Sequence, residues 1–475
     1  MLRCFPLLLV LLSGCTMLQA DVVAVDTPRD VAAPPPVAVA QGAEALRAGP
    51  MLGYATHREV AVWVQTTRPA DVQLRYAPTE NGHAAPARPG VTEVLRATAE
   101  TDHIATFHIA DLEPGTRYRY DVLIDGVAAM RPYPTQFQTQ ALWEWRTDPP
   151  DFTVAVGSCF YVNDTIYDRP GNPYGGDYRI LSSIRARRPD LMLWLGDNTY
   201  LREVDWWSER GMRYRYSHSR SLAELQPLLA STANYATWDD HDYGPNDSDR
   251  SYVLKGAALD VFQDYWPNVS YGLPDVPGVF THFQWADAEF FLLDDRYHRT
   301  PNAEPDWEDR QVLGDAQLEW LLEALTASRA PFKIVALGGQ VLNPTQIYET
   351  YANVAPEERE RLLAGIVARR IEGVVFLSGD RHHTEVIRLQ PEGFYPLYDF
   401  TSSPLTAGAA TPEREFDNPA RVPGTLVSGK RNFGTLSFYG PRRDRTLVMR
   451  TYDTDGALLW ELAVNASDLQ LPRGR

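Results

Sequence analysis

The sequence predicts an α/β protein whose layered β-sandwich core is flanked by helices, with a second, small β-sandwich on the amino-terminal side. Two patterns lead to this prediction. From residue 152 onward, apolar strand-like runs alternate with helical patterns, which is typical of a layered α/β fold. Residues 52–139 instead contain short strand-like runs separated by turn residues, which is typical of a β-sandwich. A chain of 475 residues, 44% of them hydrophobic, is long enough to bury a core in each of two domains.

The first residues have the pattern of an export signal. Arg3 precedes an apolar run over residues 5–12 that is far too short to span a bilayer. The sequence Leu-Ser-Gly-Cys, which ends at Cys15, resembles the cleavage site of a bacterial lipoprotein. We therefore expect a signal peptide at residues 1–14 and lipidation of Cys15, which would anchor an exported, periplasm-facing protein in a membrane, the outer one if the source is Gram-negative. An ordinary secretory signal that is cut further along the chain is the alternative.

A tether and the smaller sandwich follow the signal. Residues 15–48 are rich in Ala, Val and Pro, a composition typical of a semi-extended linker. Residues 49–140 are predicted to form the sandwich domain. Residues 112–120, Leu-Glu-Pro-Gly-Thr-Arg-Tyr-Arg-Tyr, resemble the tyrosine corner of a fibronectin type III-like domain. The strands expected in this domain are residues 61–64, 72–76, 103–109 and 118–124.

The composition limits the partners and the redox chemistry of the chain. A formal net charge of −17 disfavours a nucleic-acid partner. An acidic protein that binds phosphate groups needs local positive charge, and bound cations supply it. The three cysteines are Cys4 in the signal, Cys15 at its cleavage site and Cys159, so the mature chain has no intramolecular disulfide. The Cys159 thiol would then be open to oxidation unless it is buried or metal-bound.

The second domain, residues 150–470, is predicted to carry polar clusters at the ends of four strands. Those strands are residues 152–156, 191–195, 235–238 and 374–377. The polar residues that follow them are Cys159, Asp197, Tyr200, residues 239–242 (Asp-Asp-His-Asp) and residues 380–383 (Asp-Arg-His-His). Ligand sites of α/β sheets lie at the carboxyl ends of the strands, so we expect these side chains to meet. Carboxylates, imidazoles, a phenol and a thiol together make a site for two or more cations.

Two further expectations for this domain concern two glycines and the remaining helix and strands. Gly196 and Gly379, at the strand ends, are expected to leave room for metal and substrate to approach the backbone. The remaining pattern predicts a helix and further strands, the last four of them in a second sheet. The helix is residues 315–327, and the strands are residues 290–293, 333–337, 400–401, 435–439, 446–451 and 458–464.

These motifs resemble the alkaline phosphatase D family, the PhoD-like branch of the calcineurin-like metallophosphoesterases. The resemblance extends from about residue 52 to the last strands and includes residues 293–296 and 313–321. The broad superfamily opens with Asp-x-His, whereas this chain, like the branch, has Gly-Ser-Cys at residues 157–159. The resemblance implies the layered metallophosphoesterase fold and the hydrolysis of phosphate esters.

The resemblance also implies roles for individual residues. Asp197 is the candidate bridge between metals, and His241 is placed beside the scissile phosphate as the catalytic residue. The middle histidine of the superfamily is absent, and Asn246 is predicted to supply a metal-binding oxygen in its place, with Gln340 as the alternative. Fe³⁺ is implied near the thiol and the phenol, and Ca²⁺ on the oxygen-rich side. The implied metal ligands are Cys159, Asp197, Tyr200, Asp240, Asn246, Asp380 and His382.

Three nearby residues receive no catalytic role. Arg296 and Arg381 are expected to close structural ion pairs with acidic neighbours rather than grip phosphate oxygens. His383 has no role that the resemblance supplies.

The predicted function is hydrolysis of a phosphate ester by attack of metal-bound hydroxide on phosphorus. His241 either stabilises the transition state or protonates the leaving alkoxide. A phosphodiesterase or phospholipase with the same metals is an alternative, and a non-catalytic, metal-stabilised envelope binding protein is another. The presence of His241 together with a full ligand set disfavours the binding protein. Residues 161–178 and 201–219, rich in Tyr, Trp and Arg, are candidate rims of the site.

Overall fold

The computed structural model describes residues 44–80, 83–84, 89–347 and 349–471, which all belong to one compact unit. The expected signal peptide, Cys15 and most of the expected tether lie outside the described residues. Strand β1 begins at Leu46, inside the segment expected to be tether. Among the described helices, none has the length and apolar character that crossing a membrane requires.

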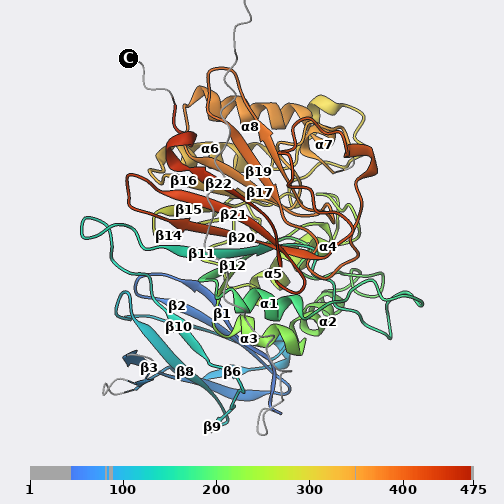
Figure 1. Ribbon diagram of the computed structural model, residues 1–475. Coiled ribbons are helices and arrows are strands. Elements are labelled where there is room, and N and C mark those ends of the chain that lie inside the picture. The colour runs from blue at the N-terminus through green and yellow to red at the C-terminus, as the bar shows by residue number, and fades with distance from the viewer. Residues whose placement is uncertain (1–43, 81–82, 85–88, 348, 472–475) are drawn as a thin grey trace, which may run out of the picture. The chain divides into compact units, whose positions relative to one another are not determined.

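The amino-terminal part is a sandwich of two sheets, drawn in blue and cyan in Figure 1. One sheet has the order β1-β2-β7, with β1 (Leu46–Ala55), β2 (Val60–Thr66) and β7 (Ile104–Ile109). The other has the order β10-β8-β3-β4, with β10 (Gln136–Gln138), β8 (Arg117–Ile124), β3 (Ala70–Glu80) and β4 (His83–Ala84). Short strands β5 (Gly90–Val91) and β6 (Leu95–Ala97) pair with β3, and β9 (Val127–Ala128) pairs with β8. Along β8, buried residues alternate with more exposed ones, as the period of a half-buried strand requires.

The hydrogen bond that defines a tyrosine corner is present in this sandwich. The backbone N–H of Glu113 donates to the phenol oxygen of Tyr118 at 2.9 Å. The Tyr118 ring also stacks on Phe137 from the neighbouring strand, with ring centroids 5.0 Å apart. The motif that the sequence placed at residues 112–120 therefore has the geometry expected of it.

The sandwich is joined to the rest of the chain through buried polar contacts. The phenol of Tyr235 accepts a hydrogen bond from the Ala55 N–H at 3.1 Å, and the phenol of Tyr120 donates to the Ala230 carbonyl at 2.9 Å. The Asn234 amide donates to the Leu52 carbonyl at 3.0 Å. One hydrophobic core also runs through both parts. The smaller sandwich therefore packs against the larger part through buried polar contacts and a shared core.

The larger part consists of two six-stranded sheets. The first has the order β13-β12-β11-β20-β21-β22, with β13 (Ala233–Thr237), β12 (Leu191–Leu195), β11 (Phe152–Gly157), β20 (Asn432–Tyr439), β21 (Thr446–Asp453) and β22 (Leu458–Asn465). The second has the order β14-β15-β16-β17-β19-β18, with β14 (Thr281–Trp285), β15 (Ala288–Leu292), β16 (Phe332–Ala336), β17 (Val374–Ser378), β19 (Leu397–Thr401) and β18 (Glu385–Leu389). Phe438 of β20 contacts Phe290 and Phe332 of the other sheet, at ring distances of 6.2 and 5.5 Å. The two sheets thus share an aromatic core.

Helices cover both sheets, which completes the layered α/β architecture (Figure 1). Apolar residues of α1, α2, α3 and α5 pack with those of β11, β12 and β13, and α6 and α8 belong to the core of the second sheet. Helix α6 has the bounds predicted for it. The helices are α1 (Ile180–Ala186), α2 (Glu209–Arg220), α3 (Gln226–Leu229), α4 (Asp240–Tyr243), α5 (Lys255–Tyr265), α6 (Asp315–Ala327), α7 (Tyr351–Val354) and α8 (Pro356–Ala368).

The prediction that the last four strands form a second sheet was wrong. Strand β20 pairs antiparallel with β11 and brings β21 and β22 into the first sheet, whereas β19 pairs with β17 in the other. The exposed edge of β11 needs a hydrogen-bonding partner, and a strand from the far end of the chain supplies it. The four strands with polar ends are consequently divided, with β11, β12 and β13 in one sheet and β17 in the other.

Candidate metal centre

The polar clusters of the four strands meet where the ends of the two sheets come together. Cys159 Sγ, after β11, lies 3.7 Å from Asp197 Oδ2, after β12. Asp197 Oδ1 accepts a hydrogen bond from the His241 N–H, after β13, at 3.3 Å. The Tyr200 phenol lies 3.3 Å from Nε2 of His382, which follows β17. The convergence expected from the strand pattern is therefore present in the structure.

Two groups of side chains in this cluster have the spacing of metal ligands. Within each group, one possible ligand atom per residue lies within 4.8 Å of the others. The groups are Cys159, Asp197 and His382, and Asp197, Asp240 and His241. Asp197 belongs to both, which is the arrangement that a bridging carboxylate requires. The geometry thus suits two adjacent cations.

The first group, named here the thiol group, is held by further hydrogen bonds, and its Cys159 and Asp197 are buried. The hydroxyl of Ser403 donates to Cys159 Sγ at 3.1 Å. The Nδ1 edge of the His382 ring is held by the Gly408 carbonyl and by the phenol of Tyr174, the latter at 3.2 Å. The other ring nitrogen is thereby turned toward the phenol of Tyr200. Such outer contacts fix the orientation of ligands around a metal.

The ionisation of the thiol group fits a bound cation. Burial, and then the charge of Asp197, raise the pKa of Cys159 well above its usual range. The same two effects raise the pKa of Tyr200. Neither group would lose its proton at neutral pH by itself, because an anion here is poorly solvated and faces a carboxylate. A cation reverses that balance, because it stabilises the thiolate and the phenolate directly.

The second group, named here the carboxylate group, depends on the short helix α4. The side chain of Asp239 caps α4 by accepting the Asp240 N–H at 2.9 Å, and the Asp247 N–H donates to Asp240 Oδ2 at 2.7 Å. Asp242 is buried and accepts the N–H groups of Asn198 and Asp239, at 2.9 and 3.1 Å. It thereby ties the loop after β12 to the start of α4. Burial raises the pKa of Asp242 to about 8, although these N–H groups act in the opposite direction.

Several of the expected ligands have left-handed backbone conformations. The φ angles are 59° at Cys159, 54° at Asp197, 60° at Asp380 and 56° at His382. Residues other than glycine rarely adopt this region, which costs about 1–3 kcal/mol each. The surrounding fold holds the four residues there, and the sharp turns let the side chains of Cys159, Asp197 and His382 leave their strand ends toward each other.

The role predicted for two glycines was wrong. A Cβ atom on Gly379 would lie 2.5 Å from Cβ of Ser158, and one on Gly196 would lie 2.7 Å from Cβ of Asp239. The space that the missing side chains leave is therefore filled by protein. These glycines allow the loops of neighbouring strand ends to approach each other, which positions the metal ligands indirectly.

Two of the predicted ligands, Asp380 and Asn246, lie outside the thiol group and the carboxylate group. Asp380 is half-buried, its carbonyl oxygen lies 3.6 Å from Cys159 Sγ, and burial with the charge of Glu349 raises its pKa to about 7. Asn246 is exposed in the turn after α4, where its side chain contacts Asp247. Neither residue belongs to the two ligand groups described above.

The arginines beside the site close ion pairs, as expected. Arg296 is fully buried and pairs with Asp239 and with Glu349, the latter at 2.6 Å. Arg381 pairs with Glu415 and donates to the side-chain amide oxygen of Gln340, Oε1, at 2.5 Å.

The amide of Gln340 and the ring of His383 are engaged in the same network. Nε2 of Gln340 donates to Glu385 and Thr401, both at 2.8 Å, while its oxygen also accepts from Asn343 at 2.8 Å. The amide has therefore used its hydrogen-bonding capacity and is not available as a metal ligand. Nδ1 of His383 bonds to the Arg381 carbonyl at 2.9 Å.

Sequence reasoning missed the residues that hold the ligands from outside. Tyr174 lies in the expected rim, residues 161–178, but nothing in its local sequence indicates a contact with His382. Ser403 and Gly408 follow β19, which was expected as a strand without chemistry. A polar run of Thr-Ser-Ser at the end of that strand was the available signal.

The fold and the site together define a metallophosphoesterase: two facing sheets whose strand ends present two ligand groups that share an aspartate. The family model for PhoD-like phosphatases matches residues 154–439, more than half of the chain, and the chain belongs to this family. A second model, a domain of unknown function (DUF7800), matches residues 43–142.

Individual relatives agree with this assignment. The chain is 25% identical over 254 residues to alkaline phosphatase D of Bacillus subtilis (strain 168), a match that spans 47% of this chain and 40% of that protein. The structure is similar to that of PhoD, with a TM-score of 0.69 and 19% identity, covering 87% of this chain and 91% of that one. It is also similar to purple acid phosphatase PPD1 from yellow lupin (Lupinus luteus) seeds, with a TM-score of 0.64 and 13% identity over 90% of this chain and 77% of that one. At such identities the two structures establish the shared fold.

Proposed function

We propose that the chain is a metal-dependent phosphoesterase that hydrolyses phosphate esters at the cluster of Cys159, Asp197, Asp240, His241 and His382. The observation that carries the proposal is the pair of ligand groups that share Asp197. When bound, cations would neutralise phosphate oxygens and lower the pKa of a water molecule, which is the chemistry that phosphate hydrolysis needs.

The donors of the two groups differ, and this difference supports different metals. A thiol, a phenol and an imidazole suit Fe³⁺ on the side of Cys159 and Tyr200. Carboxylate oxygens suit Ca²⁺ on the side of Asp240, where Asn246 remains a candidate oxygen ligand. Asp380 remains a candidate ligand for the first side, where its backbone carbonyl oxygen lies 3.6 Å from Cys159 Sγ.

The surroundings of His241 favour one of its two expected roles. Its ring lies against Tyr200, with centroids 4.3 Å apart, and its Nδ1 has no hydrogen-bond partner within the described part of the chain. Burial lowers the pKa of His241, and nearby cations would lower it further. A neutral ring that donates an N–H to a phosphate oxygen therefore fits better than a charged acid, so we assign His241 to transition-state stabilisation.

Removal of metal tests the proposal directly. Purified protein is expected to contain iron and calcium and to hydrolyse phosphate monoesters, and calcium chelation should abolish most turnover while the iron remains bound. Elemental analysis before and after chelation, with turnover measured in parallel, provides the check. A metal-replete protein without phosphatase activity would instead support the envelope binding protein.

Diester or phospholipid hydrolysis is a second candidate, favoured by exposed apolar side chains on the rim segments. Ile166 is 76% exposed and Trp207 is 66% exposed, and Tyr167 contacts Tyr214 across the two segments at a ring distance of 5.7 Å. The first segment reaches the thiol group through Tyr174, and apolar side chains on such a segment suit a substrate with an apolar substituent. A panel of monoesters, diesters and phospholipids distinguishes the two functions, because only a diesterase would prefer the bis-substituted phosphates.

We also propose that the mature protein is exported and carries a lipid on Cys15, on the basis of the sequence pattern at residues 1–15. Cys15→Ala is expected to release the protein into the aqueous fraction, since acylation of this cysteine provides the anchor. Detergent phase partitioning and mass spectrometry of the amino terminus check this. Wild-type protein that already partitions into the aqueous phase, with a free amino terminus beyond Cys15, would contradict lipidation.

A further inference from the structure

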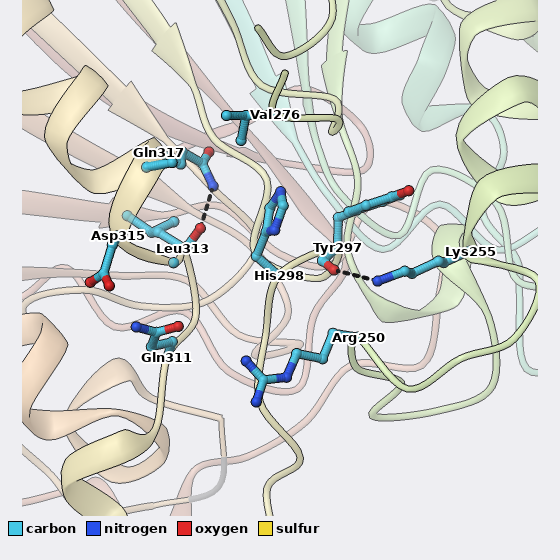
Figure 2. A pocket seen from close by; sticks show the side chains of 11 residues that line it. Arg250, Lys255, Val276, Tyr297, His298, Gln311, Leu313, Asp315 and Gln317 are labelled. Carbon is cyan, nitrogen blue, oxygen red and sulfur yellow. Dashed lines mark hydrogen bonds between the residues drawn. The ribbon is translucent and has the colours of Figure 1, made fainter. Parts of the chain in front are cut away.

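A second polar cavity lies between the loop that follows α4 and the first turn of α6, and we name it the α6 pocket. Its volume is about 210 Å³, and it is lined by Arg250, Lys255, Tyr297, His298, Gln311 and residues 313–317 (Figure 2). None of these residues belongs to the two ligand groups of the metal centre. The α6 pocket is therefore a separate feature that the proposed hydrolysis does not use.

Two cationic side chains line the α6 pocket without a carboxylate partner. Across the described residues, neither Arg250 nor Lys255 forms an ion pair. The Lys255 ammonium reaches the Tyr297 carbonyl at 3.5 Å and lies 4.6 Å from the centre of the Tyr297 ring. Burial and the guanidinium of Arg250 lower the pKa of Lys255, and Asp294 and Asp249 offset this in part. Two like charges at one cavity repel each other, and a bound anion would remove that repulsion.

Other polar side chains also line the α6 pocket. One acid, Asp315, lines the pocket, and its carboxylate is paired with Arg361 at 2.7 Å. The His298 ring is held by a hydrogen bond between Nε2 and the Pro277 carbonyl at 2.8 Å. The side-chain amide of Gln311 also lines the wall, as Figure 2 shows. The first turn of the 13-residue helix α6 also lies at this wall, and the Glu358 carboxylate accepts the N–H groups of residues 312–314 just before it, at 2.5–3.0 Å.

We propose that the α6 pocket binds a small, doubly charged oxyanion of the size of phosphate, with Arg250 and Lys255 as its charged contacts. Its volume is below the range of about 300–1,000 Å³ that is typical of drug-sized ligands, which favours a small ion. The ligand chemistry is that of inorganic phosphate or of the phosphoryl end of a small ester. In a chain of net charge −17, such a site needs local cations, and here they are unpaired.

Another basic cavity of the protein differs from the α6 pocket in how its cationic side chains are partnered. A cavity of about 320 Å³ is lined by Arg329, Lys333, Arg369 and Arg370, among others. There the Lys333 ammonium donates to the carbonyls of Ala330 and Glu372, at 2.9 and 2.8 Å, and Arg369 pairs with Glu319 at 2.6 Å. The carboxyl ends of α6 and α8 lie in the same region of the chain and favour cations. Lys333 and Arg369 of that cavity are thus partnered by the protein, whereas neither cation of the α6 pocket has a carboxylate partner among the described residues.

Tungstate, a phosphate-shaped oxyanion, tests the proposal. Crystals of the metal-loaded full chain are soaked in millimolar tungstate, and anomalous scattering locates each bound ion, while isothermal titration counts the sites in solution. We expect one ion at the metal centre and one in the α6 pocket. In R250Q/K255Q the pocket ion should disappear or bind at least about tenfold more weakly, because both charge-assisted contacts are lost. The control R329Q/R370Q has the same change of charge and should keep both ions.

Each outcome decides the proposal. Wild-type crystals with no ion in the α6 pocket would overturn it, as would equal weakening in the control, which would mean that net charge alone governs binding. Should R250Q/K255Q fail to fold, as judged by circular dichroism, R250Q alone is used, since Arg250 is exposed. Wild-type crystals with an ion in the α6 pocket but none at the metal centre would speak against the proposed function and still support anion binding in the α6 pocket.

Discussion

Replacement of Cys159 by Ser is expected to remove iron, visible colour and turnover together. The thiol lies in the thiol group beside Asp197 and His382, and its backbone is held at a φ of 59° that aims it there. A ferric ion bound by thiolate and phenolate absorbs visible light through ligand-to-metal charge transfer, and the harder, far less acidic serine hydroxyl does not replace the thiolate. Iron content, the visible spectrum and phosphatase turnover are the measurements.

Matched variants separate ligation from packing in this cluster. Tyr200→Phe should also abolish the colour, whereas Tyr161→Phe should keep it, although the two rings lie 4.9 Å apart. Ser403→Ala should retain iron but shift the absorption band, because it removes the 3.1 Å hydrogen bond to the sulfur. A Cys159→Ser protein with full iron and full turnover would make Cys159 a packing residue, which buried free cysteines often are.

The site was largely predictable because parallel strands place their carboxyl ends at one edge. Mostly apolar runs of four or five residues located β11, β12, β13 and β17. The polar residues just after β11, β12 and β13 then had to come near each other, because these strands are parallel neighbours in one sheet, whereas β17 meets them from the other sheet. Buried parallel strands have such continuous apolar runs, so the signal was strong. The bounds of α6 also followed from its helical periodicity.

Other features depend on contacts that local patterns do not encode. The apolar period of β20 indicates a strand but not its partner, and its pairing with β11 joins segments from opposite ends of the larger part. The contacts of Ser403 and Tyr174 with the thiol group likewise join distant segments. Gly379 allows close approach of Ser158, and this role depends on a contact between distant segments that the local sequence does not indicate.

His241→Asn is expected to lower turnover by roughly a hundredfold while iron and calcium stay near their normal content. The backbone N–H of His241 bonds to Asp197, and an asparagine at the same position keeps that contact. The substitution removes the imidazole N–H that would reach the substrate in the transition state. Turnover is measured with an aryl phosphate and with an alkyl phosphate, alongside metal content.

The two substrates also separate the roles that His241 could have. A general acid matters most for the poor alkyl leaving group, whereas a donor to a nonbridging oxygen affects both substrates alike. The lowered pKa of the half-buried His241 ring predicts the second result. His218→Asn is the matched control, since that ring is also half-buried but bonds to the Asn163 carbonyl at 2.9 Å, outside the ligand groups. Because His241 also lies within ligand distance of Asp240, loss of calcium together with activity would make it a metal ligand instead. Normal turnover on both substrates would remove it from the mechanism.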